Sequence, residues 1–433
     1  MTTVGGARLF CRDDPRDSFV LAGVRVLDPA QGLDGTFDLT VSEGVITALE
    51  PAAATGSGLL VAPAFVDPHV HLRTPGREDE ETLATGSAAA AAGGYCAIVA
   101  MPNTDPAVDS AAVLGSLIEL AREEARVPLG FMAGISKGLA GEELTEMGEL
   151  AALGAIAFTD DGHPVSSPNL MRRALQYSAV ADRPLAVHCE ERGLSRDGQM
   201  HEGAVSAELG FTGWPSIAES VMVERDIAIA GYEGRPIHLM HVSARESVAA
   251  LARGRAAGVR VTGEASPHHL CATDELVRTL STNAKMNPPL RTEDDRRTLV
   301  AAVRDGTISC IATDHAPHAL HEKDAPFEEA PFGVTGLETA FAVLYTRLVL
   351  TGELALETVL ERMSAGPARV LGLPEPAVKL GETANLVVLD LAAEWVVGEH
   401  GFHSRSTNSW LTGETLTGKV VRTIADGRVV FPA

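Results

Sequence analysis

The chain has 433 residues, of which 45% are hydrophobic and 21% are charged, a composition typical of globular rather than disordered proteins. Its net charge of -23 argues against nucleic acid and anionic lipid as partners, because binding either needs clustered Lys and Arg. Five dispersed cysteines without C-x-x-C spacing, and an N-terminus without a long apolar segment, predict a soluble cytoplasmic protein with reduced thiols and no membrane span.

Both ends of the chain show the pattern of short antiparallel strands. The apolar runs at 18–28 and 37–51 are interrupted by Asp, Gly and Pro, as are the runs at 384–391 and 419–431, the last of which contains the turn pair Asp426-Gly427. We therefore expect residues 1–62 and 373–433 to form one small composite β-sandwich domain.

Residues 63–372 instead alternate between strand and helix patterns. Apolar residues at i, i+3 and i+4 predict helices at 171–181, 220–233 and 244–258. Apolar runs that close on a polar residue predict strands at 59–72, 95–103, 128–136, 154–162, 184–191, 236–243, 259–269 and 309–318. Such a series of strand–helix units over about three hundred residues predicts an α/β fold, a (β/α)8 TIM-like barrel.

The polar residues at the strand ends are candidate ligands, because the C-terminal strand ends form the active face of such a barrel. They are His69, His71, Asn103, Asp160, Asp161, His188, His241, Glu264 and Asp314. Strands that end in imidazoles and strands that end in carboxylates converge on one mouth. This convergence predicts a metal site.

His69 and His71 are separated by one residue, so both imidazoles point to the same face of a strand. A lone His-x-His pair is as often a packed pair as a ligand pair, but the other strand-end residues favour metal binding here. His188 and His241, each at the end of its own strand, would supply two imidazole ligands to a second cation, since zinc-type ions prefer nitrogen and carboxylate ligands.

Two aspartates at the fourth strand compete for a bridging role. A carboxylate can join two cations about 3.5–4 Å apart, and the chemistry alone leaves Asp160 and Asp161 both open because adjacent residues face opposite ways. No lysine ends this strand, and Lys137 is expected to be an ordinary loop residue. Asp314 at the eighth strand is suited to accept a proton from the nucleophile and return it to a leaving nitrogen.

Several motifs occur in a recognisable order along most of the chain. They are VDPHVHLR at 66–73, TPG at 74–76, MPNT at 101–104, FTDDG at 158–162, HCE at 188–190, HVS at 241–243, SPHHL at 266–270, NPPLR at 287–291, TDHAPH at 313–318, PFG at 331–333 and NLVVLD at 385–390. This series resembles the dihydroorotases of the cyclic amidohydrolase superfamily, most closely the long bacterial class I enzymes, which use a bridging aspartate.

The resemblance implies a role for each matching residue. The metal ligands would be His69 and His71 for one zinc ion, His188 and His241 for a second, Asp161 as the bridge, and Asp314 as both ligand and catalytic acid/base. Arg73, Asn103 and His318 would hold the substrate carboxylate. The remaining expected substrate contacts are His71, Asn287, Phe332 and Gly333.

The implied reaction is the reversible conversion of (S)-dihydroorotate to N-carbamoyl-L-aspartate in de novo pyrimidine (UMP) biosynthesis, through a metal-bound hydroxide. A hydantoinase, dihydropyrimidinase or allantoinase is the alternative cyclic amidase. Arg73 argues against it, because a guanidinium pairs with a carboxylate that a plain hydantoin lacks. A non-catalytic scaffold for aspartate transcarbamoylase is the alternative from another class. The resemblance is compatible with a homodimer and with such a complex, and the segment 318–332 has the length and charge of a mobile lid.

Overall fold

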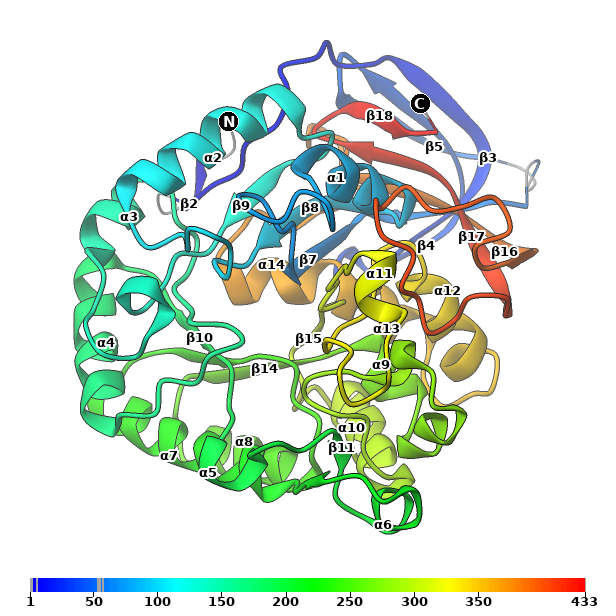
Figure 1. The fold of residues 1–433 in the computed structure, drawn as a ribbon. Helices are drawn as coiled ribbons and strands as arrows, with labels where there is room; N and C mark the ends of the chain where they lie inside the picture. Colours follow the sequence, from blue (N-terminus) through cyan, green and yellow to red (C-terminus); the bar gives the residue numbers. More distant parts are fainter. Residues whose placement is uncertain (1–2, 5–6, 53–55, 57, 433) are drawn as a thin grey trace.

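Parallel strands pair around a closed ring in the computed structural model, which describes residues 3–4, 7–52, 56 and 58–432 (Figure 1). The ring strands are β7 (Phe65–Val70), β8 (Tyr95–Ala100), β9 (Leu129–Phe131), β10 (Leu185–Val187), β13 (Ile237–Leu239), β14 (Val261–Ala265) and β15 (Cys310–Ile311). The pairings β7-β8-β9 and β10-β13-β14-β15 are all parallel. Isolated parallel bridges join these two groups on both sides.

The fourth ring position is reduced to a single residue. Phe158 forms parallel bridges with Ala133 on one side and with Leu185 of β10 on the other. The ring closes where Val70 at the end of β7 pairs in parallel with His315, just after β15. Asp67 strengthens this closure, because its carboxylate accepts hydrogen bonds from Thr313 Oγ1 at 2.6 Å and from the Thr313 amide.

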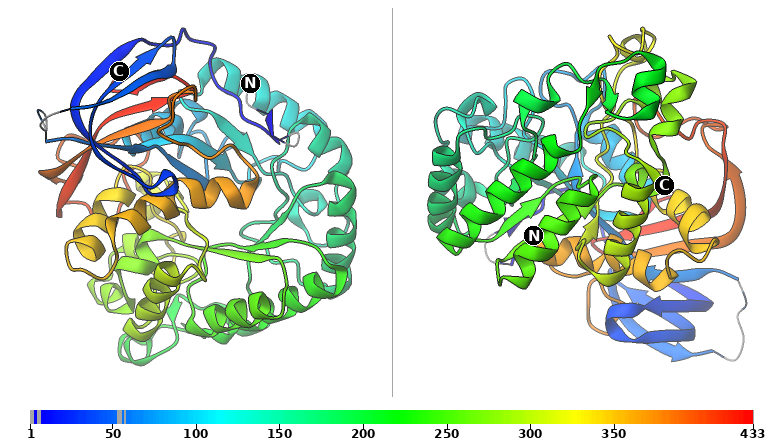
Figure 2. Two further views of the ribbon diagram at one scale, coloured as in Figure 1. Left: turned by 180° about the vertical axis from the view of Figure 1, so that it is seen from behind. Right: turned by 90° about the horizontal axis from the view of Figure 1, so that it is seen from below.

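Helices surround the ring on its outer side (Figures 1 and 2). The helices of seven or more residues are α1 (Leu83–Ala92), α2 (Ala111–Glu124), α3 (Met147–Leu153), α4 (Pro168–Ala181), α7 (Ile217–Glu233), α8 (Arg245–Ala256), α10 (Glu293–Asp305), α13 (Leu356–Met363) and α14 (Ala365–Leu371). The shorter ones are α5 (Arg192–Ser195), α6 (Ala204–Leu209), α9 (Pro267–Cys271), α11 (Leu320–Lys323) and α12 (Ala340–Leu344). None in the described part of the chain is long and apolar enough to cross a membrane.

Local sequence signals account for the helix ends. Thr292 and Asp295 form a reciprocal capping box at the start of α10, and Gly306 ends that helix in a left-handed conformation that glycine adopts without strain. Ser167 caps α4 by accepting from the Leu170 amide. The apolar faces of these helices pack on the ring and form one continuous buried core with it.

The strands from the two chain ends form one seven-stranded sheet beside the barrel (Figure 2). Its order is β18 (Arg428–Phe431), β17 (Thr415–Ala425), β16 (Leu386–Val396), β6 (Leu60–Pro63), β3 (Phe19–Asp28), β4 (Leu33–Ser42) and β5 (Val45–Pro51). β6 lies at the centre, antiparallel to β16 and parallel to β3, so it joins the N-terminal strands to the C-terminal ones.

The sheet curls so that its N-terminal edge meets the segment before β16. Val45 pairs with Thr383, and the Ala384 amide donates to Gly44 O. The enclosed space is filled by a separate hydrophobic cluster that includes Val26, Leu39, Val61, Leu386 and Ile424. The predicted fold class, an α/β barrel with a composite β-sandwich from both termini, is therefore confirmed, and the sandwich is formed by this one curled sheet.

Two short strand pairs lie outside these sheets. β1 (Thr3–Val4) pairs with β2 (Ala7–Arg8), and β11 (Met200–His201) pairs with β12 (Gly213–Trp214). After β2 the chain runs along the barrel, where Phe10 pairs with Leu129 of β9 through two hydrogen bonds of 2.8 Å. The residues just after the N-terminus thus contact the barrel before the chain enters the curled sheet.

Candidate metal centre

His69, His71 and Asp314 form the first of two buried clusters at the C-terminal mouth of the ring. The Nε2 atoms of His69 and His71 lie 3.4 and 3.2 Å from Asp314 Oδ1. His69 is fully buried, and its Nε2 has no hydrogen-bond partner. An unpaired buried nitrogen costs free energy, so an imidazole held this way fits the role of a metal ligand.

Asp161, His188 and His241 form the second cluster. His188 Nδ1 and His241 Nε2 lie 3.7 and 3.6 Å from Asp161 Oδ1 and 2.9 Å from each other. His188 Nε2 donates to Glu190 Oε2 at 3.2 Å, which leaves its Nδ1 lone pair facing the cluster. Two imidazoles and one carboxylate thus converge, as in zinc-type sites.

Asp161 faces both clusters with different oxygens. Its Oδ2 lies 3.5 Å from His69 Nε2 and 3.4 Å from His71 Nε2, while its Oδ1 faces the other histidine pair and lacks a hydrogen bond. Asp160 points away, because its carboxylate accepts from the amide and hydroxyl of Ser136. The geometry supports Asp161, not Asp160, as the bridging carboxylate.

The charges of the cluster call for positive charge at its centre. Burial alone would raise the pKa of Asp161, but the imidazoles of His69, His241 and His71 outweigh it and hold that pKa well below its usual value. Burial likewise opposes a charged His69, yet Asp161, Asp314 and Glu264 raise its pKa well above the ordinary value. Cations at this position would satisfy the same carboxylates.

Glu264, at the end of β14, lies behind the first cluster and not in it. Its Oε1 accepts from His69 Nδ1 at 2.7 Å and from the His241 amide at 3.2 Å, and its Oε2 accepts from His238 Nε2 at 3.0 Å. His238 therefore points to Glu264 and not toward the mouth. The strand-end pattern found Glu264 but did not reveal that it orients two histidines.

Asn103 accepts a hydrogen bond of 2.9 Å from His71 Nδ1 through its side-chain oxygen. This contact leaves the Asn103 amide hydrogens for another partner and directs the His71 Nε2 lone pair toward the cluster. His315, in contrast, points away from the barrel mouth while remaining buried. Its Nε2 lies 3.2 Å from Glu81, and its Nδ1 accepts from the Gly336 amide. Lys137 pairs with Glu143 at the surface, as expected for a loop lysine.

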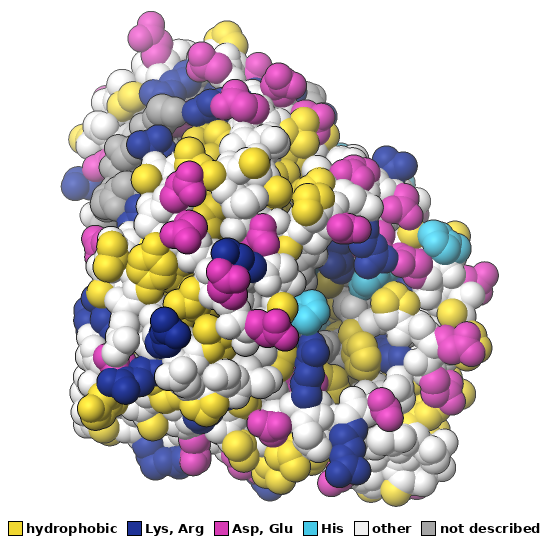
Figure 3. All heavy atoms as spheres, turned by 60° about the vertical axis from the view of Figure 1, so that its left-hand side comes forward, with side chains coloured by type: hydrophobic (Ala, Val, Ile, Leu, Met, Phe, Trp, Pro, Cys, Tyr) yellow, Lys and Arg dark blue, Asp and Glu magenta, His cyan; other side chains and the backbone are white. Residues whose placement is uncertain are grey.

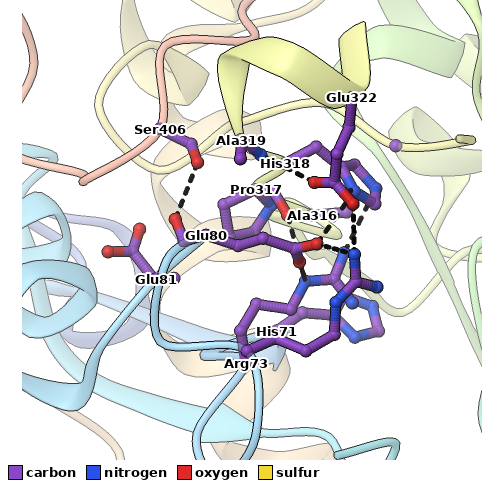
Figure 4. Close-up of polar contacts among 12 residues, drawn as sticks. His71, Arg73, Glu80, Glu81, Ala316, Pro317, His318, Ala319, Glu322 and Ser406 are labelled. Carbon is purple, nitrogen blue, oxygen red and sulfur yellow. Dashed lines mark hydrogen bonds and ion pairs between the residues drawn. The ribbon is translucent and has the colours of Figure 1, made fainter. Parts of the chain in front are cut away.

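Arg73 lies in a network of charges beside His71 (Figure 4). Its Nε donates to Pro317 O at 3.0 Å and lies 2.9 Å from Glu80 Oε2. Glu80 is fully buried and also forms an ion pair with Arg77. The sequence predicted Arg73 but missed Glu80, because the spacing of seven residues along a loop carries no periodic signal.

His318, which was expected to hold the substrate carboxylate together with Arg73, lies in contact with that arginine. Its Nε2 donates to Phe332 O at 2.8 Å and lies 3.3 Å from Arg73 Nη2, while its Nδ1 lies 3.6 Å from Glu80 Oε1. Burial, followed by the charges of Arg73 and Lys323, lowers the pKa of His318 to about 2, so its imidazole is neutral.

The other expected substrate contacts differ in whether their polar atoms already have hydrogen-bond partners within the protein. Asn287 Oδ1 is buried without a partner and therefore fits a ring N–H donor. Phe332 O is taken by His318, and the Gly333 amide donates to Lys285 O at 2.9 Å. Gly333 has a φ of 127°, and a Cβ there would lie 2.7 Å from Ala316 Cβ, so only glycine fits.

Three residues of this region adopt the left-handed backbone conformation that non-glycine residues rarely use. Arg73, His241 and Asp314 have φ angles of 57°, 33° and 50°. Such conformations persist only where surrounding contacts enforce them, and they concentrate at functional sites. The strain therefore marks the same strand ends that the histidines and aspartates mark.

Comparison with known proteins identifies close relatives over the whole chain. A dihydroorotase from Trichlorobacter lovleyi is 43% identical over 96% of this chain and 99% of its own length. A dihydroorotase from Anaeromyxobacter dehalogenans is 45% identical over 96% of this chain and 98% of its own. The family model described as Dihydro-orotase-like matches residues 58–247.

The solved structures that resemble this one share its fold at low sequence identity. An L-hydantoinase from Arthrobacter aurescens superposes with a TM-score of 0.84 over 95% of both chains at 23% identity. A D-hydantoinase reaches a TM-score of 0.81 at 22% identity. These likenesses show a common fold, whereas the relatives of more than 40% identity show the family. The chain belongs to the dihydroorotase family of cyclic amide hydrolases.

Proposed function

We propose that this protein interconverts (S)-dihydroorotate and N-carbamoyl-L-aspartate in pyrimidine synthesis, with two zinc ions in the candidate metal centre. The observation that carries the proposal is the pair of buried three-residue clusters joined by Asp161, with a buried arginine next to them. The full-length relatives named dihydroorotase support the same reaction.

The donor set fits two zinc-type cations. His69, His71 and Asp314 would hold one, His188 and His241 the other, and Asp161 would contact both. When bound, the cations would polarise the ring carbonyl and lower the pKa of a water molecule. The unpartnered Nε2 of His69 and Oδ1 of Asp161 are the atoms that need such a partner.

Asp314 would hold and move the proton. Its Oδ1 lies within 3.4 Å of both His69 and His71, and these imidazoles overcome burial and keep its pKa below the ordinary value. An ionised carboxylate accepts the proton of the attacking water. It then returns that proton to the departing ring nitrogen, and in the reverse direction it deprotonates the ureido nitrogen.

Arg73 would recognise the carboxylate that distinguishes dihydroorotate from a hydantoin. Its side chain is only 10% exposed, so pairing with a second carboxylate takes place away from bulk water. Asn103 would add its free amide hydrogens, and Asn287 Oδ1 would accept from a ring nitrogen. His318, whose Nε2 lies 3.3 Å from Arg73 Nη2, would line the other wall of the carboxylate site.

The location and the surface fit a metabolic enzyme with a small substrate. All five cysteines are unpaired, which supports the proposed location in a reducing cytoplasm.

On the face seen in Figure 3, acidic and basic side chains are interspersed, and no basic stripe of the kind that binds nucleic acid runs across it. A purely scaffolding partner of aspartate transcarbamoylase would not need the six converging ligand residues that this chain keeps.

The test compares substrates on one preparation of known metal content. The purified protein is loaded with zinc, its metal is counted by mass spectrometry, and turnover of dihydroorotate, hydantoin and allantoin is measured. We expect about two zinc ions per chain and turnover of dihydroorotate in both directions. Turnover of hydantoin or allantoin without dihydroorotate would reassign the substrate, and a zinc-loaded protein inactive on all three would favour the scaffold.

A further inference from the structure

The segment 404–408 belongs to the sheet region in sequence but reaches the barrel mouth. It lies in the connection between β16 and β17, and its residues Ser404, Ser406 and Asn408 are all at most 5% exposed. Buried polar side chains in a connection are unusual unless each has a partner. Their partners are the two segments that carry Arg73 and His318.

Asn408 joins three main-chain atoms around His318. Its Oδ1 accepts from the His318 amide at 3.1 Å, and its Nδ2 donates to Ala316 O at 3.1 Å and to Gly333 O at 3.2 Å. One acceptor and two donors are thus all used, and this combination fixes the orientation of the amide group. Aspartate has the same shape as asparagine, but its side chain has no N–H group to donate to the two carbonyl oxygens.

Ser404 and Ser406 hold the other side, the loop that follows Arg73. Figure 4 shows Ser406 beside Glu80 of this loop. Ser406 Oγ donates to Glu80 O at 2.7 Å, and the side chain of the same Glu80 forms the ion pair with Arg73. Ser404 Oγ donates to Glu81, which also pairs with His315 next to Asp314. The segment 404–408 therefore contacts both walls of the proposed carboxylate site.

We propose that Asn408 and Ser406 are positioning residues that set the distance between Arg73 and His318, so that the connection between β16 and β17 shapes the proposed substrate site from outside it. Neither side chain belongs to the two clusters of His and Asp residues, and both side chains bind main-chain atoms of the barrel loops. The proposal rests on the proposed function for its kinetic arm only. A substrate carboxylate is bound well only when both walls are held within about half an ångström of the productive geometry.

The test uses the zinc-loaded full chain and the variants Asn408→Ala, Asn408→Asp and Ser406→Ala. We expect Asn408→Ala to raise KM for dihydroorotate about tenfold while kcat changes less than about threefold, because binding and not proton transfer is disturbed. Asn408→Asp should do more damage, since a buried carboxylate would face two carbonyl oxygens. Ser406→Ala, which loses one contact, should raise KM about threefold.

Asn385→Ala is the matched control, because its side chain accepts from the Asp426 amide within the same sheet region. It should leave KM unchanged at a temperature below unfolding. Hydrogen–deuterium exchange gives a second readout that needs no substrate: residues 314–320 and 331–337 should exchange faster in Asn408→Ala and not in the control.

The two proposals fail in distinguishable ways. A wild-type protein that does not turn over dihydroorotate refutes the proposed function, while the exchange experiment still decides the role of Asn408. Wild-type KM together with wild-type exchange at 314–320 in Asn408→Ala would overturn the positioning role. Faster exchange spread over the whole chain would overturn it too, since it would show a general loss of stability.

Discussion

Glu264 accepts a hydrogen bond of 2.7 Å from His69 Nδ1 and so decides which ring nitrogen of His69 faces the candidate metal centre. A carboxylate behind a histidine fixes its tautomer and orientation and makes it a better ligand. The same carboxylate holds the His241 amide, so one side chain orients a histidine from each cluster.

We therefore expect Glu264→Gln to lower zinc affinity by about tenfold to a hundredfold, because a neutral amide accepts more weakly from His69. Competition with a chromophoric chelator measures this affinity directly and without substrate. Asp28→Asn is the control, since Asp28 is a buried carboxylate that accepts from Val378 in the sheet region. Equal zinc affinity in Glu264→Gln and wild type would contradict the role of Glu264.

The adjacent pair Asp160 and Asp161 provides its own control. Asp161 faces four imidazoles, whereas Asp160 is bound to Ser136. Asp161→Asn should reduce bound zinc from about two ions per chain to about one or none, because an amide cannot neutralise two cations. Asp160→Asn should keep the zinc and lose some stability. Retention of zinc by the first variant with loss by the second would reverse the assignment.

The sequence predicted which histidines and aspartates converge at the barrel mouth, because that information is local. The period of two on a strand places His69 and His71 on one face, and the same rule turns His238 away from His241. The end of each apolar run then shows where the mouth lies. Even the fourth ring position was detected, although it forms only the bridges of Phe158 and no strand of its own.

What the sequence could not predict depends on contacts between distant segments. Glu80 pairs with Arg73 only because the loop between them folds back, and Asn408 reaches His318 from 90 positions further along the chain. A distant contact also decides which aspartate faces the clusters, because Ser136 donates hydrogen bonds to Asp160 and turns it away from them. Residue type and spacing carry no record of such pairings.

Arg73→Ala should lower kcat/KM for dihydroorotate by about a hundredfold to a thousandfold, since it removes the charged partner of the substrate carboxylate. Its zinc content should stay the same, because no arginine atom belongs to the two clusters. Arg77→Ala is the control: this half-exposed arginine pairs with Glu80 and Glu322 but not with His318, and its loss should cost far less activity. Equal losses of zinc and turnover in Arg73→Ala would refute the role of Arg73.

Lys323 anchors the segment 318–332, whose length and charge in the sequence are those of a mobile lid. Its Nζ is buried and donates to Thr282 O at 3.1 Å and to Pro331 O at 2.8 Å. Burial, together with the charges of Lys285 and Arg73, lowers its pKa from 10.5 to about 7. The folded state disfavours the charged amine, so Lys323 lowers the stability of the fold. This cost is at its full size below pH 7, where Lys323 is protonated in both the folded and the unfolded protein. This cost disappears as the pH rises toward 10.5, since the unfolded chain then binds more protons than the folded one.

The stability of the wild type relative to Lys323→Met should therefore rise with pH, by roughly 2 kcal/mol between pH ~7 and ~9. Denaturant unfolding of both proteins at the two pH values measures the difference. Lys137→Met removes a lysine that is 47% exposed and whose pKa Glu143 raises, so its difference from wild type should stay flat over the same range. If the stability of the wild type relative to Lys323→Met stays constant or falls between these pH values, the Lys323 amine remains charged in the folded protein. Its two carbonyl partners would then hold it as an ammonium.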